Sequence, residues 1–350
     1  MNEATLMDFV QKTAGLIVGA TVCAGIQLGD RLGLYAALAT GPQTADELAS
    51  DTGCNARLIR EWLDGQAAAG LVDFDADQDT YLLSPEGVMV LADPTSPVFL
   101  ARGVQGASSV YIDMDKLAEA YQSDGAMAWG DHHECLFKGT EWFFRPGYRA
   151  HLTAEWIPAL DGVADKLQAG ARVADVGCGH GASLAVMAQA YPESTFTGID
   201  YHGPSVDTAR TRMEEAGVSE RCDFQTADAQ GYDGTYDLIC FFDCLHDMGD
   251  PVGAARYARE HLSPGGTVLL VEPFAIDGRS ANIDANPFAP MLYHASAMIC
   301  TPNSLSQDVG LGLGAQAGEE RLREVITEAG FSDLSRRAET PFNLVLQASP

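Results

Sequence analysis

The stretch ARVADVGCGHGASLAVMAQAY, residues 171–191, decides the fold. It begins as an apolar strand, passes through Gly177, Gly179 and Gly181, and continues as an apolar segment of helical length. A strand, a glycine-rich turn and a helix in this order are typical of the first unit of an α/β sheet. The turn reads GxGxG rather than the dinucleotide fingerprint GxGxxG, so its backbone can approach a ligand that need not carry phosphate.

Four further strand-like segments follow this unit. They are STFTGIDYH (194–202), CDFQTADAQ (222–230), YDLICFFDCLHDM (236–248) and GTVLLVEPF (266–274). This alternation of strands and helices predicts a doubly wound, Rossmann-like α/β sheet with its ligand site at the carboxyl ends of the strands. Asp175, Asp200 and Asp228 lie at successive strand ends, and this series makes the signal specific. Helix capping is the alternative role for Asp200 and Asp228.

The first 90 residues have a different pattern. Helical spacing over 5–38 precedes a capping box at Thr44-Ala-Asp-Glu47, and Asn55 is placed to cap a third helix. A strand–turn–strand, LVDFDADQDTYLLS (71–84), follows. Three helices and a hairpin predict an all-helical N-terminal region that ends as a winged helix.

The charge balance restricts the partners. The chain has 350 residues, of which 49 are acidic and 21 basic, giving a formal net charge of −28. A chain this anionic repels a phosphate backbone, so we expect no nucleic acid partner. Aspartates in the expected wing strengthen this expectation. No uninterrupted apolar run approaches the roughly 20 residues of a membrane span. The acidic N-terminus also lacks the order of a signal peptide, which predicts a cytoplasmic protein without a membrane partner.

The eight cysteines are scattered through the chain. None forms a CxxC pair, and no His/Cys cluster has zinc-finger spacing. We therefore expect reduced thiols and no metal.

The sequence resembles class I S-adenosylmethionine-dependent methyltransferases that carry an N-terminal winged-helix dimerisation domain. It is similar to small-molecule O-methyltransferases of that architecture, and to a bacterial group with VADVGCGHGAS (173–183), FFDCLHDMGDP (241–251) and TPFNLVL (340–346). The resemblance covers essentially the whole chain and is most specific over 172–275. It implies S-adenosylmethionine as cofactor and a small-molecule methyl acceptor.

The resemblance also implies a set of cofactor residues. The first motif would line the methionine half of the cofactor, Asp200 would accept hydrogen bonds from the ribose hydroxyls, and Tyr201 would lie against adenine. Asp228 and Ala229 would lie at the adenine edge, with Phe242 and Asp243 beside the sulfonium. The implied residues are Asp175, Gly177, Gly179, Gly181, Asp200, Tyr201, Asp228, Ala229, Phe242 and Asp243. Carboxylates also suit a cationic sulfonium and ammonium ligand, because each pairing is charge-assisted.

His246 is the candidate catalytic base. In the O-methyltransferases that the chain resembles, a histidine followed by an aspartate at this place removes the acceptor proton. An imidazole near its unperturbed pKa accepts a proton at neutral pH, and Asp247 is placed to orient it. A pocket-lining role for His246 is the equal alternative.

Substrate residues are expected in two variable regions, 88–150 and 276–315. Aromatic residues beside arginines suit a small anionic or aromatic substrate, although inter-domain core is the equal alternative. The candidate substrate residues are Trp142, Arg145, Tyr148, Arg149, Glu272, Tyr293 and Asn343. For Glu272, closing the sheet is the alternative role.

The pattern divides the chain into a winged-helix dimerisation domain (1–90), a helical linker and substrate segment (91–155) and a methyltransferase domain (156–350). The apolar stretch LIVGATVCAGIQL (16–28) would expose a sizeable patch in a monomer, so we expect a homodimer.

Three other functions remain open from the sequence. The first is S-methylation of a small thiol or thioether acid, such as a methylthio-hydroxy acid in dimethylsulfoniopropionate synthesis, which would need no base. The second is a winged-helix transcriptional regulator that senses a ligand. The third, a non-catalytic relative, is disfavoured by the intact acid series.

Overall fold

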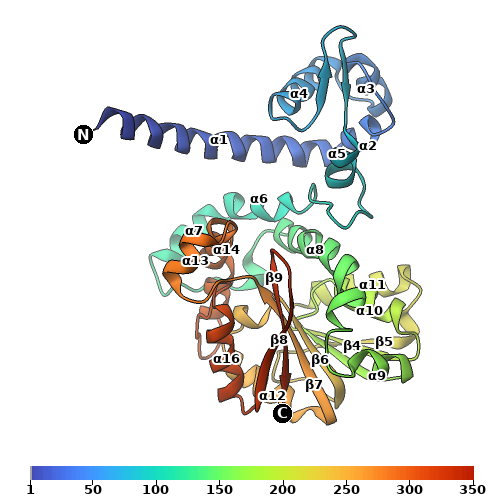
Figure 1. The fold of residues 1–350 in the computed structure, drawn as a ribbon, viewed down its shortest axis with the longest axis vertical. Helices are drawn as coiled ribbons and strands as arrows, with labels where there is room; N and C mark the ends of the chain where they lie inside the picture. The colour runs from blue at the N-terminus through green and yellow to red at the C-terminus, as the bar shows by residue number, and fades with distance from the viewer. Residues whose placement is uncertain (1) are drawn as a thin grey trace. The chain divides into compact units, whose positions relative to one another are not determined.

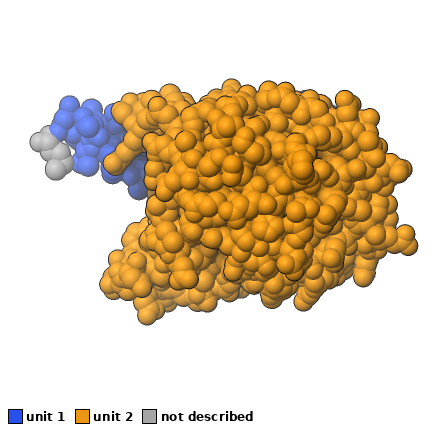
Figure 2. Space-filling view, turned by 90° about the horizontal axis from the view of Figure 1, so that it is seen from below, with its two compact units in different colours: residues 1–108, 138–146 blue, residues 109–137, 147–350 orange. Residues whose placement is uncertain are grey.

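The computed structural model describes residues 2–350 and divides the chain into two compact units. The first unit comprises residues 1–108 and 138–146, and the second comprises residues 109–137 and 147–350 (Figure 2). Each unit has its own hydrophobic core. They are described separately below.

A seven-stranded sheet forms the centre of the second unit, in the order β5-β4-β3-β6-β7-β9-β8 (Figure 1). Its strands are β3 (Arg172–Val176), β4 (Thr195–Asp200), β5 (Cys222–Thr226), β6 (Tyr236–Phe242), β7 (Leu262–Pro273), β8 (Asp333–Glu339) and β9 (Asn343–Ser349). The five strands from β3 to β7 are parallel, whereas β9 runs antiparallel to both β7 and β8. The predicted doubly wound sheet is confirmed.

Helices pack on both faces of this sheet because its central strands are largely apolar. On one face η3, a π-helical segment, contacts α10, and α10 contacts α11; on the other face α12 packs on α16. Their bounds are η3 (Tyr148–Trp156), α9 (Val163–Ala169), α10 (Ala182–Ala190), α11 (Gly203–Glu215), α12 (Pro251–Glu260) and α16 (Gly318–Glu328). Because β3 to β7 are parallel, their carboxyl ends lie at one edge of the sheet, where the turns after β3, β4 and β6 meet.

Shorter elements complete the second unit. They are α7 (Met114–Tyr121), η2 (Trp129–Asp131), η4 (Ser219–Arg221), η5 (Leu245–Asp247), α13 (Arg279–Ala285), α14 (Ala289–Ala295), η6 (Ser296–Cys300) and α15 (Thr301–Leu305). A buried amide network fixes the chain after β7: Asn282 accepts from the backbone N–H of Ile276 and donates to Gln316. Two further helices, α6 (Val104–Ile112) and α8 (Cys135–Gly147), have residues in both units.

The first unit has the predicted order of three short helices and a hairpin. Its elements are α1 (Glu3–Arg31), α2 (Leu34–Leu38), α3 (Ala45–Thr52), α4 (Ala56–Ala68), β1 (Asp73–Asp75), β2 (Thr80–Leu82), α5 (Pro85–Gly87) and η1 (Val88–Ala92). Thr44 and Glu47 form the predicted capping box, and the Asn55 side chain accepts from two backbone N–H groups of α4. On the hairpin, the Asp79 carboxylate pairs with both terminal nitrogens of Arg60.

The first helix is largely exposed over its 29 residues. By length and composition alone it could cross a membrane, with a hydropathy of 1.5 and none of its most apolar window buried. The expectation based on uninterrupted apolar runs missed this helix. An N-terminal helix of this kind is weak evidence for a membrane span, because a signal sequence or the core helix of a soluble protein meets the same criterion.

Candidate functional site

Asp175 lies at the centre of the edge where the strands end. Its side chain is fully buried, Ser183 Oγ donates to its Oδ2 at 2.6 Å, and its Oδ1 has no hydrogen-bond partner among the described residues. Burial raises the pKa of Asp175 to about 7, against the hydrogen bond from Ser183, which lowers it. A buried carboxylate oxygen without a donor is costly, so a donor from a ligand would stabilise it.

The glycine turn supplies open space beside this acid. Gly179 has a φ of +51°, and a Cβ added there would meet nothing within 4 Å. Gly177 has a φ of +76°, and its added Cβ would lie 2.7 Å from the Sγ of Cys244. Gly177 therefore permits close packing inside the protein. Gly179 leaves a space that a side chain would fill.

Asp200 ends β4 and anchors the glycine turn. Its Oδ2 accepts from Gly179 N at 2.9 Å, and its Oδ1 accepts from His202 N at 2.8 Å. Burial raises its pKa, and these two backbone hydrogen bonds oppose the rise. The next residue, Tyr201, keeps 48% of its surface exposed, which leaves an aromatic ring available beside the acid.

The expected adenine edge lies in the turn after β5. Asp228 is exposed, and its Oδ1 accepts from Gln230 N at 2.8 Å. Ala229 is partly buried and packs against the core of the sheet. The carboxylate thus shapes its own turn, and its second oxygen accepts no hydrogen bond within residues 2–350 that would compete with a ligand.

Asp243 follows β6 with a φ of +52°, a left-handed conformation that is rare outside glycine. Its two carboxylate oxygens accept from the Tyr148 hydroxyl at 3.1 Å and from Asn343 Nδ2 at 2.9 Å. Burial and the nearby Glu272 carboxylate raise its pKa well above the ordinary value. Phe242, which precedes it, is buried and packs against the ring of Tyr148.

His246 lies between two carboxylates. Its Nδ1 is hydrogen bonded to Oε2 of Glu272, and its Nε2 lies 3.0 Å from Oδ1 of Asp247. Burial lowers the pKa of His246, but the two carboxylates outweigh it and raise the pKa well above the usual value. The expectation of an unperturbed imidazole is therefore wrong, because the carboxylates at both ring nitrogens favour the protonated form of His246.

Cys300 completes this cluster from the end of η6. The ligand-type atoms of His246, Asp247 and Cys300 lie within 4.8 Å of one another. Burial raises the pKa of Cys300 to about 12, so its thiol is protonated. A protonated thiol is a poor metal ligand, because the thiolate is the form that binds metal, and the absence of a metal stays a prediction.

The structure gathers some of the predicted substrate residues and not others. Tyr148, Glu272 and Asn343 converge on Asp243 and His246 as described above. Tyr293 instead accepts a hydrogen bond from Asn282, and Arg149 is exposed. Trp142 and Arg145 belong to the first unit, where the Arg145 guanidinium lies 4.5 Å from the centre of the Trp142 ring.

Sequence reasoning missed two relationships at this site. The first is Glu272 as the partner of His246, although an acid ending the strand next to the histidine was a usable signal. The second is Ser183 as a donor to Asp175, for which its position on the first turn of α10 was a weaker signal.

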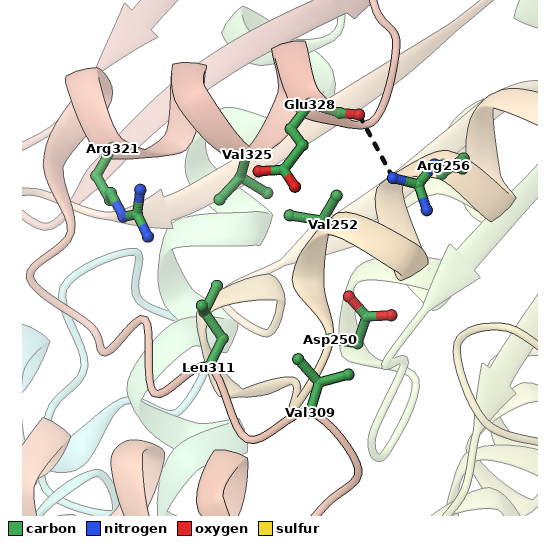
Figure 3. A pocket seen from close by; sticks show the side chains of 8 residues that line it. All are labelled: Asp250, Val252, Arg256, Val309, Leu311, Arg321, Val325 and Glu328. Atoms are coloured by element: carbon green, nitrogen blue, oxygen red, sulfur yellow. Dashed lines mark hydrogen bonds between the residues drawn. The ribbon is translucent and has the colours of Figure 1, made fainter.

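A separate small pocket of about 240 Å³ contains none of the predicted site residues (Figure 3). It lies between α12, α16 and the chain at 309–311. It is lined by Asp250, Val252, Arg256, Val309, Leu311, Arg321, Val325 and Glu328. Val309, at its edge, has a positive φ of 71°.

Comparison with known families matches both parts of the chain. Residues 174–268 match a methyltransferase domain, and residues 20–93 match an Rv2258c-like winged helix-turn-helix domain. These matches coincide with β3 to β7 and with the helices and hairpin of the first unit.

Individual relatives are also methyltransferases. The mitomycin biosynthesis 6-O-methyltransferase of Streptomyces lavendulae is 26% identical over 290 residues, which cover 80% of this chain and 79% of that protein. Human N-acetylserotonin methyltransferase, solved with S-adenosylmethionine, aligns with a TM-score of 0.71 and 19% identity over 100% of this chain and 98% of its own. A methyltransferase of calicheamicin biosynthesis, solved with S-adenosylhomocysteine, aligns with a TM-score of 0.68 and 19% identity over 100% of both chains.

The fold and these matches define an enzyme that transfers methyl groups. The chain contains a methyltransferase domain over 174–268 and a winged helix-turn-helix domain over 20–93, and its fold is that of solved S-adenosylmethionine-dependent methyltransferases.

The residues present fit this cofactor. A cationic ligand with an ammonium donor suits the unpartnered Oδ1 of Asp175, and a Cβ added at Gly179 would meet only open space.

Proposed function

We propose that this enzyme methylates an oxygen nucleophile of a small molecule by in-line displacement, with His246 as the base. The observation that carries the proposal is the pairing of His246, after β6, with Glu272 of β7, near the buried Asp175 and the half-buried Asp243. The O-methyltransferases among the relatives support an oxygen acceptor.

The acids prepare the cofactor site electrostatically. Asp175 is desolvated with one oxygen unpartnered, and Asp200 is held by two backbone donors, so both favour a ligand that brings positive charge and hydrogen-bond donors. We assign Asp175 and the turn Gly177–Gly181 to the methionine half, Asp200 to the ribose and Tyr201, Asp228 and Ala229 to the adenine. Phe242 and Asp243 are assigned to the sulfonium end. When bound, S-adenosylmethionine supplies an electrophilic methyl group on a positively charged sulfur.

His246 moves the proton in this proposal. Glu272 fixes the ring through Nδ1, so Nε2 is the nitrogen that accepts a proton from the acceptor's hydroxyl. Asp247 contacts Nε2 in the resting state and must yield this contact to the acceptor. Because the two carboxylates stabilise the imidazolium, they strengthen His246 as a base once it is neutral.

The acceptor site is assigned to the residues around this histidine. Tyr148, Asn343 and Glu272 surround Asp243, and we propose that they bind the acceptor together with Arg149 and Tyr293 of the same unit. Methylation of a thioether would leave the His246–Glu272 pair without a proton to move. That alternative and the regulator are not favoured by the mitomycin relative, which is an O-methyltransferase.

A screen of donor consumption tests the proposal. Purified enzyme with S-adenosylmethionine is offered phenols, other hydroxyl compounds, amines, thiols and thioether acids. We expect turnover with a hydroxyl compound, and a large loss in His246→Ala that high pH partly restores. Turnover confined to thioethers, with His246→Ala little affected, would contradict the proposal.

The N-terminal part of the chain has a second proposed role. We propose a cytoplasmic homodimer in which residues 1–90 form the dimerisation domain, residues 91–155 the substrate segment and residues 156–350 the catalytic domain. The exposed apolar side chains of α1 support this assembly, because no other part of residues 2–350 covers them. Arg60, on the third helix of the winged helix, is occupied by Asp79, which supports the absence of a nucleic acid partner. A gel-shift assay at low salt tests that absence, and tight duplex binding would overturn it.

A further inference from the structure

The loop that follows His246 is held by polar side chains of residues 303–307. Ser304 Oγ donates to the Met248 carbonyl at 2.8 Å, and the Gln307 side chain accepts from Gly249 N at 3.0 Å. The carbonyl of Asp247 accepts from Asn303 Nδ2 at 3.1 Å and from Gln307 Nε2 at 3.2 Å. Every residue of 247–249 is therefore bound by a side chain of α15 or of the turn after it.

The contact between these segments is close enough to fix their register. A Cβ added at Gly249 would lie 2.5 Å from the Cβ of Gln307 and 2.6 Å from the carbonyl oxygen of Asp308. Neither atom is the end of a flexible side chain, so only glycine permits this approach. The position of His246 therefore depends on the position of α15.

Asn303 differs from its neighbours because it also reaches two other segments. Its Oδ1 accepts from Trp129 N at 2.9 Å and from the Tyr201 hydroxyl at 3.2 Å, while its Nδ2 holds Asp247. The residue is 4% exposed. One buried amide thus joins the turn after β4, the segment at 127–131 and the loop after His246, all within the second unit.

The surroundings of Trp129 show why this connection reaches the cofactor side. Met127 N donates to the Pro302 carbonyl at 3.0 Å, so the segment lies along α15. The rings of Trp129 and Phe137 are 5.5 Å apart, and Phe137 lies 4.9 Å from the ring of His202. His202 directly follows Tyr201 and donates its backbone N–H to Asp200.

We propose that Asn303 is a positioning residue that couples occupation of the cofactor site at Tyr201 to the order of the loop after His246 and of residues 127–131. This inference rests on the proposed roles of Tyr201 and His246. An asparagine suits the task because its oxygen accepts two hydrogen bonds while its nitrogen donates. Ordering Tyr201 through a bound ligand therefore orders the amide, and the amide orders both other segments. Its removal leaves buried backbone groups of Trp129 and Asp247 with fewer partners.

Hydrogen–deuterium exchange with and without S-adenosylhomocysteine tests the coupling, because it needs no methyl acceptor. In the wild-type enzyme we expect the ligand to slow exchange in three places: the turns at 177–181 and 200–203, the loop 246–249 and the segment 127–131. In Asn303→Ala the first effect should remain, while the slowing at 246–249 and 127–131 should fall at least fivefold. Affinity for S-adenosylhomocysteine, measured by calorimetry, should weaken about five- to tenfold.

Two comparison variants separate coupling from general loosening. Gln307→Ala removes contacts to Asp247 and Gly249 but none to Tyr201 or Trp129. The ligand should therefore still slow exchange at 246–249 and at 127–131 in this variant. Asn303→Asp keeps the accepting oxygen and loses the donor, so slowing should persist at 127–131 and disappear at 246–249; this variant also carries the test if Asn303→Ala fails to fold. Persistence of both effects in Asn303→Ala, or no distant effect in the wild type despite ligand binding, overturns the inference. A wild-type enzyme that does not bind S-adenosylhomocysteine instead overturns the assigned cofactor site.

Discussion

Glu272, near the end of β7, is hydrogen bonded through its Oε2 to Nδ1 of His246, which follows the neighbouring strand β6. Its other oxygen accepts from the backbone N–H of Leu245 at 3.0 Å. Both the ring and the backbone that carries it are thus fixed by one carboxylate. The pair therefore ties η5, which carries His246, to strand β7, which carries Glu272.

The first prediction concerns the pH dependence of turnover. The two carboxylates raise the pKa of His246, so the neutral, basic imidazole increases as pH rises above the ordinary histidine value of about 6.5. The kcat should therefore rise with pH, with its midpoint above that value. Glu272→Gln removes one of the raising charges, so the midpoint should move to lower pH and the plateau should fall about 10- to 100-fold.

The measurement is a pH–rate profile with the acceptor found by the screen. Glu220→Gln, which removes one exposed acidic charge in η4, is the matched control and should leave the profile unchanged. An unshifted midpoint in Glu272→Gln would show that His246 is not the group that titrates.

The second prediction concerns Asp175. Its pKa in the folded protein is about 7, above the unfolded value of about 3.9, so its ionisation disfavours the ligand-free fold progressively from pH 4 to 7. Asp175→Asn should therefore melt higher than the wild type at pH 8, with a much smaller difference at pH 5. The same variant should bind S-adenosylhomocysteine at least tenfold more weakly, because an ammonium loses its anionic partner.

Thermal melts at both pH values and calorimetry check this pair of effects. Binding to the wild-type enzyme should also release protons at pH 7, since a cationic ligand favours the ionised carboxylate. Calorimetry in two buffers of different ionisation enthalpy measures that release. A variant that melts lower at pH 8 would contradict the assigned cost of burying Asp175.

The third prediction separates two glycines of the same turn. Gly179→Ala should cost about 1 kcal/mol through its positive φ and place a methyl group in open space, so the fold should survive while cofactor affinity falls. Gly177→Ala adds a clash with the Cys244 sulfur to the same strain, so it should lower stability further. Denaturant unfolding measures the stability of both variants, and calorimetry measures their affinity for the cofactor. Unchanged affinity in Gly179→Ala would show that Gly179 does not belong to the cofactor site.

The fourth prediction concerns the exposed face of α1. Leu16 is 70% exposed and Ile17 is 63% exposed, although both are large and apolar. Replacing both with glutamate should convert a dimer into monomers in sedimentation analysis, because buried like charges would oppose association. Thr13→Glu, at an exposed polar position of the same helix, should not. A wild-type protein that sediments as a monomer would exclude the proposed assembly.

Much of the fold could be read from local pattern. The strand–turn–helix at 171–191 fixed the first sheet unit, and the caps at Thr44 and Asn55 form as expected because capping depends only on neighbouring residues. The acids at the strand ends could also be located, since parallel strands bring their carboxyl ends to one edge.

The contacts within the site were harder to predict. Glu272 meets His246 because β6 and β7 are neighbours with a particular register, and Asn343 meets Asp243 only through the antiparallel return of β9. The pKa of His246 was misjudged for the same reason, since its shift comes from carboxylates at both ring nitrogens. Pairings across strands depend on register and order, which residue types alone do not specify.

The desolvated acids also make the stability of the folded enzyme depend on the cellular supply of methyl donor. Desolvation raises the pKa of Asp175 and of Asp243. The positive charge of the bound methyl donor would offset the cost of ionising these two acids. A folded state that its ligand stabilises is better populated when that ligand is abundant. In a cell starved of methyl donor, this protein is therefore expected to open more often and to be degraded faster, so that its abundance follows the supply of the group it transfers.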